Sequence, residues 1–406
     1  MTISTRRLAT AAFVVASALS GASGAAAGEQ PPAPPTCGAI ITADTKLGSD
    51  LTDCPGDGVV IGADNITLDL NHHTIDGDGS PGTAGPDIGI RNDGYDGVTI
   101  EDGTVQEFDF GVRLDGPSGN SLLGVVSTRN GRAGIRVQNS GGDALVGNTV
   151  ASNGTFGIIF FGGTHDNLVE KNTVSDNGGG GIGDFVSDHD RIVHNVVSGN
   201  DEGIVAGGSS DTLIERNAVS DNFVGIVVGG SDRNTVSANR VSGNLDGIVV
   251  DGDGNTVVRN HVSDALGCDD GEGCGFGISV EGGADNLIAE NDVARTLHSG
   301  IRLDAYGAPV TGNVFRDNNV HAAGVDGIAI DTDHAGPVLN TLLDGNRVTG
   351  AADDGIDVES AATTLTRNVA THNGDLGIEA IAGVIDGGHN HARGNGNPAE
   401  CTNIAC

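Results

Sequence analysis

The sequence predicts an all-β fold, a parallel β-helix of about 13 coils, from a repeat of about 22 residues, short β-branched segments in each repeat, and few aromatic residues. Aromatic residues make up 3% of the chain. Glycine followed by isoleucine or valine recurs in steps of 22, 23, 23, 24, 22, 22, 22, 30, 23, 27, 28 and 22 residues. Such a period is typical of a solenoid, in which each repeat buries its apolar face against its neighbours. The pairs are Gly89-Ile90, Gly111-Val112, Gly134-Ile135, Gly157-Ile158, Gly181-Ile182, Gly203-Ile204, Gly225-Ile226, Gly247-Ile248, Gly277-Ile278, Gly300-Ile301, Gly327-Ile328, Gly355-Ile356 and Gly377-Ile378.

Each coil is predicted to contain three short strands. In the repeat at 225–244, segments 226–228, 235–237 and 240–242 are separated by Gly, Asn, Asp and Ser. β-Branched residues with a period of two between turn residues indicate strands. Equivalent strands then pair in parallel about 4.8 Å apart. Because side chains alternate along a strand, Ile226 and Val228 are expected to point inward and to belong to two aliphatic columns.

A column of asparagines is predicted at one corner of the coils. Stacked amides can hydrogen-bond from coil to coil and satisfy the backbone of the turns, so we interpret the column as structural. Its expected members are Asn148, Asn172, Asn195, Asn217, Asn239, Asn260, Asn291, Asn313, Asn346 and Asn368.

The first residues are typical of an export signal. Arg6 and Arg7 precede an apolar run at 8–19, and small residues follow up to Ala27. The arginine pair leaves general secretion and twin-arginine export both open. We divide the chain into a signal peptide at 1–27, a proline-rich linker at 28–36, an N-terminal cap with the first coils at 37–88, the β-helix at 89–388 and a C-terminal cap at 389–406. The protein is therefore expected outside the cell, in the periplasm or at the cell surface.

The six cysteines form three pairs that are close in sequence. An even number in an exported chain favours disulfides over free thiols. The first and last pairs are expected to staple the two caps, and the middle pair to close a small loop. The pairs are Cys37 with Cys54, Cys268 with Cys274, and Cys401 with Cys406.

The charge of the chain excludes some partners. A net charge of −35 excludes binding of nucleic acid or anionic lipid through the surface field. No apolar stretch is long enough to span a bilayer.

The repeat units, Asn-x-Val followed by Asn-x-x-Gly-Ile-x-Val, resemble the right-handed, single-stranded parallel β-helix proteins of the pectate-lyase-like superfamily, and most closely its NosD-like, sugar-hydrolase-type repeats. The resemblance covers about residues 58–388. It implies a right-handed coil, which agrees with the general handedness of parallel connections. That superfamily contains lyases, hydrolases, epimerases and adhesins, so the resemblance does not fix a reaction.

The first candidate site lies on the late coils, where the longest steps also occur. The interior of a β-helix is filled, so functional side chains are expected on outward positions and in lengthened loops. His298 and Asp326 lie just before their strands and are expected at the edge of this face. The outward residues form one column of Glu281, Asp304, Asp331 and Glu359, beside another that contains Arg302 and Asp357.

Two chemistries fit this acidic face. In hydrolysis, Asp304, Asp331 and Asp357 act as general acid and base, which requires one raised and one lowered pKa. In β-elimination, a cation neutralises a uronate carboxylate while Arg302 or His298 removes the proton. A solvated acidic surface is the alternative. Calcium suits a cluster of oxygen ligands, and its predicted ligands are Asp304, Asp331, Asp357 and Glu359.

A second polar cluster falls on earlier coils. His165-Asp166 and His189-Asp190 lie at the same offset after their glycines and are expected to stack, while Asp184 occupies an inward register unless a bulge turns it outward. Turn caps and a transition-metal site are both open here.

An apolar strip is expected to be exposed on the middle coils, where a loop or a second subunit could cover it. Its members are Phe161, Phe185, Val205, Val227 and Val249.

The sequence therefore predicts a secreted, carbohydrate-active β-helix protein, a polysaccharide hydrolase or lyase that acts through the acidic late-coil face. The alternative is a non-catalytic module that binds cell-surface glycans or partners. A metal-handling role like that of NosD is a third possibility, which the near absence of Met and of free Cys disfavours.

Overall fold

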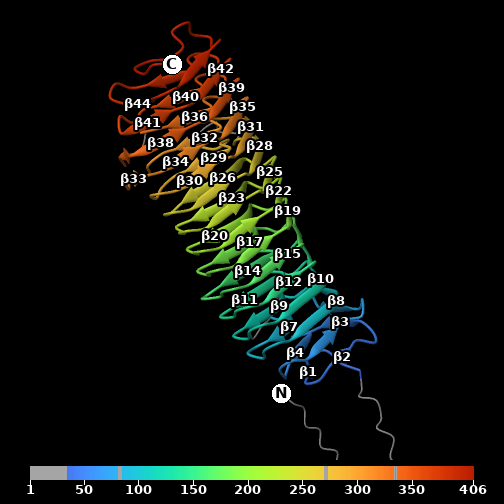
Figure 1. Ribbon diagram of the computed structural model, residues 1–406. Coiled ribbons are helices and arrows are strands. Elements are labelled where there is room, and N and C mark those ends of the chain that lie inside the picture. Colours follow the sequence, from blue (N-terminus) through green and yellow to red (C-terminus); the bar gives the residue numbers. More distant parts are fainter. Residues whose placement is uncertain (1–33, 81–84, 269–272, 333, 335) are drawn as a thin grey trace, which may run out of the picture. The chain divides into compact units, whose positions relative to one another are not determined.

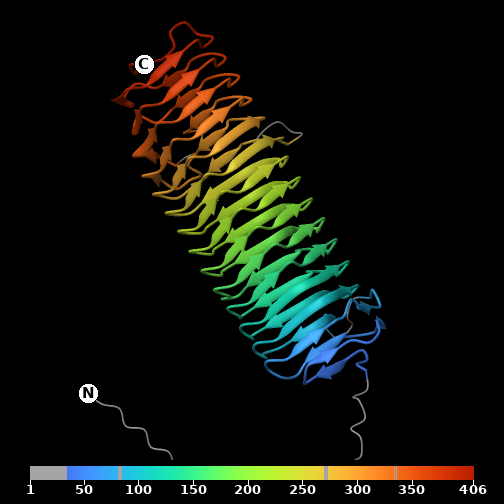
Figure 2. The ribbon, with the colours of Figure 1, turned by 45° about the vertical axis from the view of Figure 1, so that its right-hand side comes forward.

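The computed structural model describes residues 34–80, 85–268, 273–332, 334 and 336–406. The predicted signal peptide and the linker up to residue 33 lie outside the described residues. Pro35–Cys406 form one compact unit, in which successive coils follow one another in sequence order (Figures 1 and 2). All strand pairings in the three rows described below are parallel, as predicted.

The first sheet carries one strand from each coil, and its 15 strands pair in sequence order. The strands of this first sheet are β1 (Ala39–Ile41), β4 (Val59–Ile61), β7 (Ile88–Asn92), β9 (Phe110–Asp115), β11 (Ile135–Gln138), β14 (Ile158–Phe161), β17 (Gly180–Phe185), β20 (Glu202–Gly207), β23 (Val224–Gly229), β26 (Asp246–Asp251), β29 (Ile278–Val280), β32 (Ile301–Leu303), β36 (Ile328–Ile330), β40 (Ile356–Val358) and β43 (Ile378–Ala380).

Two further rows complete each coil, and the long strands β8 and β10 run through both. The second row is β2 (Thr45–Lys46), β5 (Thr67–Asp69), β8 (Thr99–Gln106), β10 (Ser121–Thr128), β12 (Ala144–Val146), β15 (Leu168–Glu170), β18 (Arg191–Val193), β21 (Leu213–Glu215), β24 (Thr235–Ser237), β27 (Thr256–Val258), β30 (Leu287–Ala289), β34 (Val314–Arg316), β38 (Thr341–Asp344), β41 (Thr363–Thr366) and β44 (Ile385–Gly388).

The third row also contains β8 and β10. Its other strands are β3 (Leu51–Cys54), β6 (Thr74–Gly77), β13 (Thr149–Ala151), β16 (Thr173–Ser175), β19 (Val196–Ser198), β22 (Ala218–Ser220), β25 (Arg240–Ser242), β28 (His261–Ala265), β31 (Asp292–Thr296), β35 (Asn319–His321), β39 (Arg347–Thr349), β42 (Val369–Thr371) and β45 (His391–Arg393). A separate pair, β33 (Val310–Thr311) and β37 (Val338–Leu339), joins two lengthened loops.

The first sheet has 15 strands, so the prediction of about 13 coils was too low. The two additional coils begin at β1 and β4. Both precede Gly89. The first carries Gly38-Ala39, and the second carries Gly58-Val59, whose step of 31 residues to Gly89 is longer than any step in the counted repeat. Among the described residues there is no helix, and none therefore that could span a membrane.

The interior is aliphatic, as the alternation predicts. Ile226 and Val228 of β23 are fully buried, and the same holds for their equivalents in the neighbouring coils. The three strands expected in the repeat at 225–244 are present as β23, β24 and β25. Burial of these columns against the coils above and below is the main stabilising contribution in a solenoid.

Buried amide ladders occupy the corners. Asn217 is typical: its Nδ2 donates to the carbonyl oxygen of Ile192 (2.8 Å) and to Asn239 Oδ1 (3.0 Å). The predicted ladder contains Asn318 between Asn291 and Asn346, and Asn313 was assigned to it wrongly. Asn313 accepts from the backbone of Asn286 in a neighbouring ladder. The coil contains Asn313, Asn318 and Asn319, and the register places Asn318 on Asn291.

The three predicted disulfides are present. Cys37–Cys54 lies at the first coil and Cys401–Cys406 in the C-terminal tail. The backbone of Cys401 also pairs with Ile378 of β43, so the tail covers the last strand of the first sheet. Cys268–Cys274 closes the small loop before β29.

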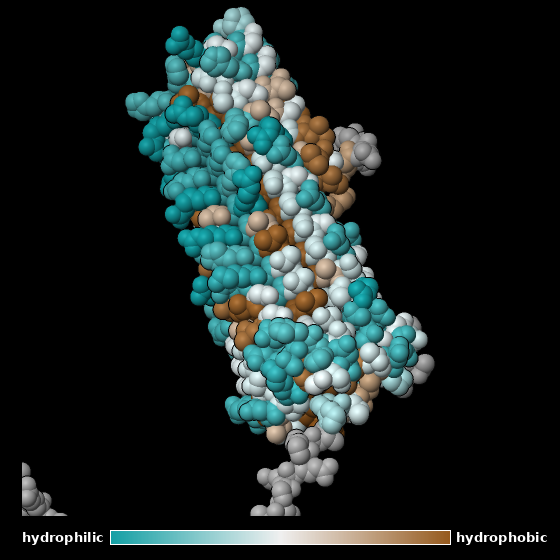
Figure 3. Space-filling model, turned by 90° about the vertical axis from the view of Figure 1, so that its right-hand side faces the viewer, coloured by the Kyte–Doolittle hydropathy of each residue, from teal (hydrophilic) through white to brown (hydrophobic). Residues whose placement is uncertain are grey.

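The apolar strip of Phe161, Phe185, Val205, Val227 and Val249 is less exposed than predicted. Val205 is only 5% exposed and the other four are half-buried. The ring of Phe185 lies over Gly183 and Gly207, where an added Cβ would approach it within 2.5 and 2.7 Å. The missing glycine side chains thus let aromatic rings fold back onto the sheet. On the side shown in Figure 3, hydrophobic residues form separate small patches rather than one band.

Candidate functional site

A groove of about 600 Å³ opens on the outer face of the first sheet at the late coils. Its lining residues come from β32 and β40, from the segments that precede β29, β32 and β36, and from the loops that follow β32, β36 and β40. The residues that line it are Gly273, Phe276, His298, Ser299, Arg302, Tyr306, Val325, Asp326, Asp331, His334, Asp357 and Glu359.

The strand register explains how these groups meet. Arg302 of β32, Ala329 of β36 and Asp357 of β40 are consecutive members of one outward column. Successive parallel strands are about 4.8 Å apart.

Arg302 is the structural centre of the groove, and it is only 8% exposed. Its Nε donates to Asp331 Oδ2 (2.7 Å), and its Nη2 donates to Asp304 Oδ2. Its Nη1 donates to the hydroxyl of Tyr306 (3.2 Å). A buried arginine between two carboxylates fixes their orientation through charge-assisted hydrogen bonds.

Aromatic rings form the walls of the groove. The guanidinium carbon of Arg302 lies 4.8 Å from the centroid of the Phe276 ring. Tyr306, which is 47% exposed, stacks on His334 with ring centroids 4.0 Å apart. His298 lies on the other side of Phe276, with centroids 5.4 Å apart. A flat ring next to exposed polar groups is suited to the apolar face of a sugar.

Two carboxyl groups of the groove have raised pKa values. Burial, followed by the charge of Asp326 and of nearby carboxylates, raises the pKa of Asp357 to about 7. Burial also raises the pKa of Asp326 to about 6, against the lowering effect of a hydrogen bond from the backbone of Asp354. The groove therefore combines two carboxyl groups with raised pKa values, of which that of Asp357 lies near neutral pH, with a carboxylate, Asp331, that is paired with Arg302.

The structure brings most of the predicted site residues together. His298, Arg302, Asp331, Asp357 and Glu359 all line the groove. The exceptions are Glu281, which is not among the residues that line the groove, and Asp304, which was expected to point outward and is 0% exposed. Asp304 lies beneath the groove because Arg302, His334 and the backbone amide of Ala305 all hydrogen-bond to its carboxylate.

Tyr306, His334 and Phe276 are functional candidates that the column pattern missed. They belong to lengthened loops, which have no register to extrapolate. The signal that could have found them is the group of long coil steps of 30, 27 and 28 residues around them.

The predicted calcium ligands do not form one cluster. The guanidinium of Arg302 lies against both Asp304 and Asp331, so these two carboxylates do not fit a cation site. Within the described part of the chain, the group of three acidic residues whose oxygens lie within 4.8 Å of one another is Asp353, Asp354 and Asp375.

The second polar cluster is not assembled as expected. His165 pairs in register with Asp188, and its Nδ1 lies 3.0 Å from Asp166 Oδ2. Asp190 is buried in a corner ladder, where it accepts from the backbone of Asn167. Asp184 keeps its inward register, is fully buried and is not turned outward.

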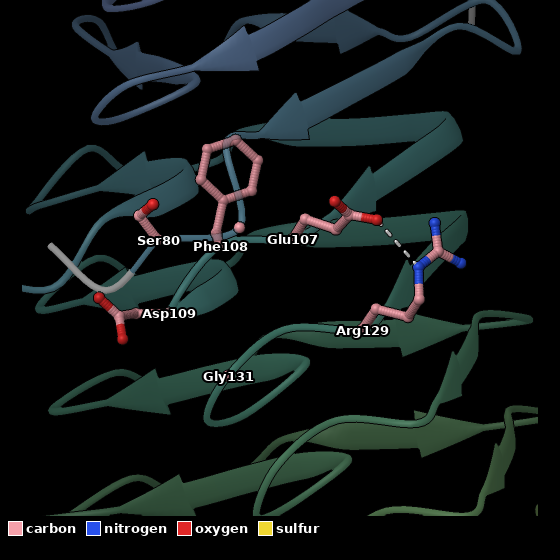
Figure 4. A pocket seen from close by; sticks show the side chains of 7 residues that line it. Ser80, Glu107, Phe108, Asp109, Arg129 and Gly131 are labelled. Atoms are coloured by element: carbon pink, nitrogen blue, oxygen red, sulfur yellow. Dashed lines mark hydrogen bonds and ion pairs between the residues drawn. The ribbon is translucent and has the colours of Figure 1, made fainter.

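A smaller pocket of about 310 Å³ lies near the N-terminal coils (Figure 4). Its charged groups already have partners: Arg129 Nε donates to Glu107 Oε1 (3.1 Å), and Asp109 Oδ2 accepts from the backbone of Asp87 (3.0 Å). We assign no function to this pocket.

The coiled parallel sheets and the groove on their outer face define a class: the chain is a right-handed parallel β-helix repeat protein. A family model described as "right handed beta helix region" matches residues 47–219. A second, described as "periplasmic copper-binding protein (NosD)", matches residues 180–333. No curated protein matches the chain in sequence.

Solved structures share this fold at low identity. The chain is similar to the periplasmic alginate epimerase AlgG, with 14% identity, 76% of each chain covered and a TM-score of 0.53. It is also similar to the alginate lyase AlyF-OU02, with 14% identity, 77% of this chain and 80% of that chain covered and a TM-score of 0.51. At this identity the likeness establishes the fold alone.

Proposed function

We propose that the protein is a carbohydrate-active enzyme that hydrolyses a glycan in the late-coil groove. The observation that carries this proposal is the presence, in one groove, of a carboxyl group with a raised pKa, Asp357, and a carboxylate, Asp331, that is ion-paired with Arg302. Asp357 acts as the general acid that protonates the leaving oxygen. Asp331, oriented by Arg302, acts on the opposite side as base or nucleophile.

The charge of the groove favours hydrolysis of a neutral glycan over elimination from a uronate. Elimination requires a cation to neutralise the substrate carboxylate. Arg302 is already shared by Asp304 and Asp331. Asp326, Asp357 and Glu359 add further acidic groups around it. A second carboxylate from the substrate would be repelled, whereas a neutral sugar would stack on Tyr306.

The names of similar proteins support the carbohydrate part of this proposal. The two solved structures named above act on alginate by their titles. A glycan partner for this chain is therefore proposed from the shared fold together with the groove, while the identity of the sugar is left to experiment.

A non-catalytic glycan-binding module is the second candidate. The exposed Tyr306–His334 stack favours it, because such a platform binds sugar without any acid–base chemistry. It predicts binding with no turnover.

Copper binding, which the name of the second family model suggests, has less support. All six cysteines are in disulfides, and the single methionine is Met1. Soft ligands of the kind that select copper are therefore not offered by the chain. Calcium remains a prediction. In this fold it would have to bind at carboxylates other than Asp304 and Asp331, and addition of chelator tests whether activity depends on it.

We also propose that the protein is exported. The pattern of residues 1–27 and the three disulfides support this, as does the periplasmic location in the names of two similar proteins.

The test is a screen of neutral and acidic polysaccharides, with mass analysis of the products. Wild type is expected to release oligosaccharides that have gained one water per cleaved bond. Asp357→Asn should abolish release, by at least about a hundredfold, because it removes the acid. Asp251→Asn, on β26 of the same sheet but outside the groove, is the matched control and should keep full activity.

Products that lack the added water would show that the reaction is an elimination and not a hydrolysis. Binding of glycan with no product would establish the second candidate. Equal activity of Asp357→Asn and wild type would refute the proposed acid.

A further inference from the structure

A second groove on the outer face of the first sheet lies about seven coils before the proposed active site. It has a volume of about 320 Å³, within the range of small-molecule sites. The residues that line this aromatic–arginine groove are Phe110, Arg132, Ala133, Arg136, Thr155, Ile159, Phe161 and Phe185.

Arg136 of β11 has an unusual environment for this chain. Its guanidinium carbon lies 5.1 Å from the centroid of the Phe110 ring and 5.0 Å from that of Phe161. Two aromatic faces thus hold the cation in place. The guanidinium is half-buried, and burial followed by the charge of Arg113 lowers its pKa.

Arg136 also differs from the nearby arginines Arg113 and Arg132 in its ion pairing. Arg113 is paired with Asp93 and Arg132 with Asp109. Across the described ranges, Arg136 makes no ion pair, and its hydrogen bond is donated from Nη2 to Gln138 Oε1 (2.6 Å). A guanidinium has five N–H donors, so most of them are available to an anion in the groove, in a chain whose net charge is −35.

The remaining wall of the groove is apolar. Phe110, Ile159, Phe161 and Phe185 supply side chains without polar atoms, and Thr155 is the only neutral polar side chain among the lining residues. Sugar hydroxyls placed here would lose hydrogen bonds to water and find few acceptors, which is costly. A flat apolar molecule with one anionic group would instead fit both the apolar wall and the guanidinium of Arg136.

We propose that the aromatic–arginine groove binds an aromatic monocarboxylate, with its ring among Phe110, Ile159 and Phe161 and its carboxylate on Arg136. The pairing of a carboxylate with a guanidinium is bidentate and charge-assisted, and the ring is removed from water against the phenylalanines. This site does not depend on the hydrolytic function proposed above.

The test uses cinnamate as the probe and isothermal titration calorimetry on the full exported chain at low salt. Wild type is expected to bind one cinnamate per chain. Cinnamamide has the same shape without the charge and should bind at least about tenfold more weakly, which is the loss of about 1.4 kcal/mol. Equal binding of the amide would contradict the role of Arg136.

Three variants separate the parts of the site. Arg136→Met removes the charge and keeps the length of the side chain, and Phe161→Ala removes one wall and keeps the charge. Each should weaken binding at least about tenfold. Arg240→Met is the control: Arg240 is exposed on β25 and lies outside the groove, so its loss should leave cinnamate affinity unchanged. If circular dichroism shows that one of the two groove variants is misfolded, the cinnamate affinity of the other variant still tests the proposal.

Other occupants would be seen in the same samples. Absence of cinnamate binding to wild type overturns the proposal. So does displacement of cinnamate by neutral or uronic oligosaccharides at comparable concentrations, which would assign the groove to a glycan. A concentration-dependent dimer by light scattering that Phe161→Ala dissociates would assign it to a second copy of the chain.

Discussion

Asp184 on β17 is a residue at which the repeat pattern is broken. It occupies the inner column between Phe160 and Ala206 and is fully buried. Its Oδ2 accepts from Thr212 Oγ1 (3.1 Å), while its Oδ1 has no partner in the described structure. Burial, together with the charge of Asp190, raises its pKa to about 8. The folded protein therefore holds a proton on the Asp184–Asp190 pair near neutral pH.

This proton makes stability depend on pH. Because the folded pKa lies above the ordinary value of 3.8, the stability that protonated Asp184 provides is present below about pH 4 and is lost as the pH rises to about 8. Asp184→Asn cannot ionise, so it should be more stable than wild type by about 2–4 kcal/mol at pH 8 and similar at pH 4. Urea midpoints at pH 4, 6 and 8 measure this. Asp188→Asn, at an exposed position two residues before Asp190, should show no such trend.

Asp357 gives the proposed enzyme its own pH dependence. If Asp357 is the general acid, kcat/KM should fall tenfold per pH unit above its pKa of about 7, because the acid is then deprotonated. Glu379 lies next to it in the column, and its charge helps to raise this pKa. In Glu379→Gln the alkaline limb should move to lower pH by about a few tenths of a unit. A flat profile between pH 6 and 9, or a limb that moves the other way, would remove Asp357 from this role.

At the scale of elements, the corner ladders bind one coil to the next. Asn318 is buried, and its Nδ2 donates to the carbonyl oxygen of Ile288 (2.8 Å) and to Asn346 Oδ1 (2.9 Å). Asn318→Ala leaves buried backbone groups without partners and should destabilise the protein by about 2–4 kcal/mol. The neighbouring residue is a matched control: in the described part of the chain, the side chain of Asn319 on β35 makes one hydrogen bond, which its Nδ2 donates to Asp292 Oδ1. Asn319→Ala should cost less than about 1 kcal/mol, and similar urea midpoints for the two variants would contradict the ladder account.

The elements also show where sequence reasoning succeeds and where it ends. Strands β23, β24 and β25 could be predicted because alternation and turn residues are local properties that each coil repeats. Asn313 was misplaced because its coil offers three asparagines, Asn313, Asn318 and Asn319, and only the register chooses among them. The burial of Asp304 and the exposed ring of Tyr306 could not be predicted, since both depend on how a lengthened loop folds back over its strand.

Across the whole molecule, one outward column of the first sheet changes in character from coil to coil. The register connects Arg113 and Arg136 at one end, Val205 and Val227 in the middle, and Asp357 near the other end. The backbone of the first sheet is nearly the same in every coil, and only the outward side chains differ in charge and polarity. Two grooves of different chemistry can therefore lie on one face without any change in the core.

The central claim is that the late-coil groove adds water across a glycosidic bond with Asp357 as the acid. The most direct measurement is cleavage of the best substrate from the screen in water labelled with oxygen-18, followed by mass analysis of the products. The account predicts one labelled oxygen per cleaved bond, at the new reducing end, for wild type and for Asp251→Asn, and no product for Asp357→Asn. Unlabelled products, or labelled products from Asp357→Asn at the wild-type rate, would contradict it.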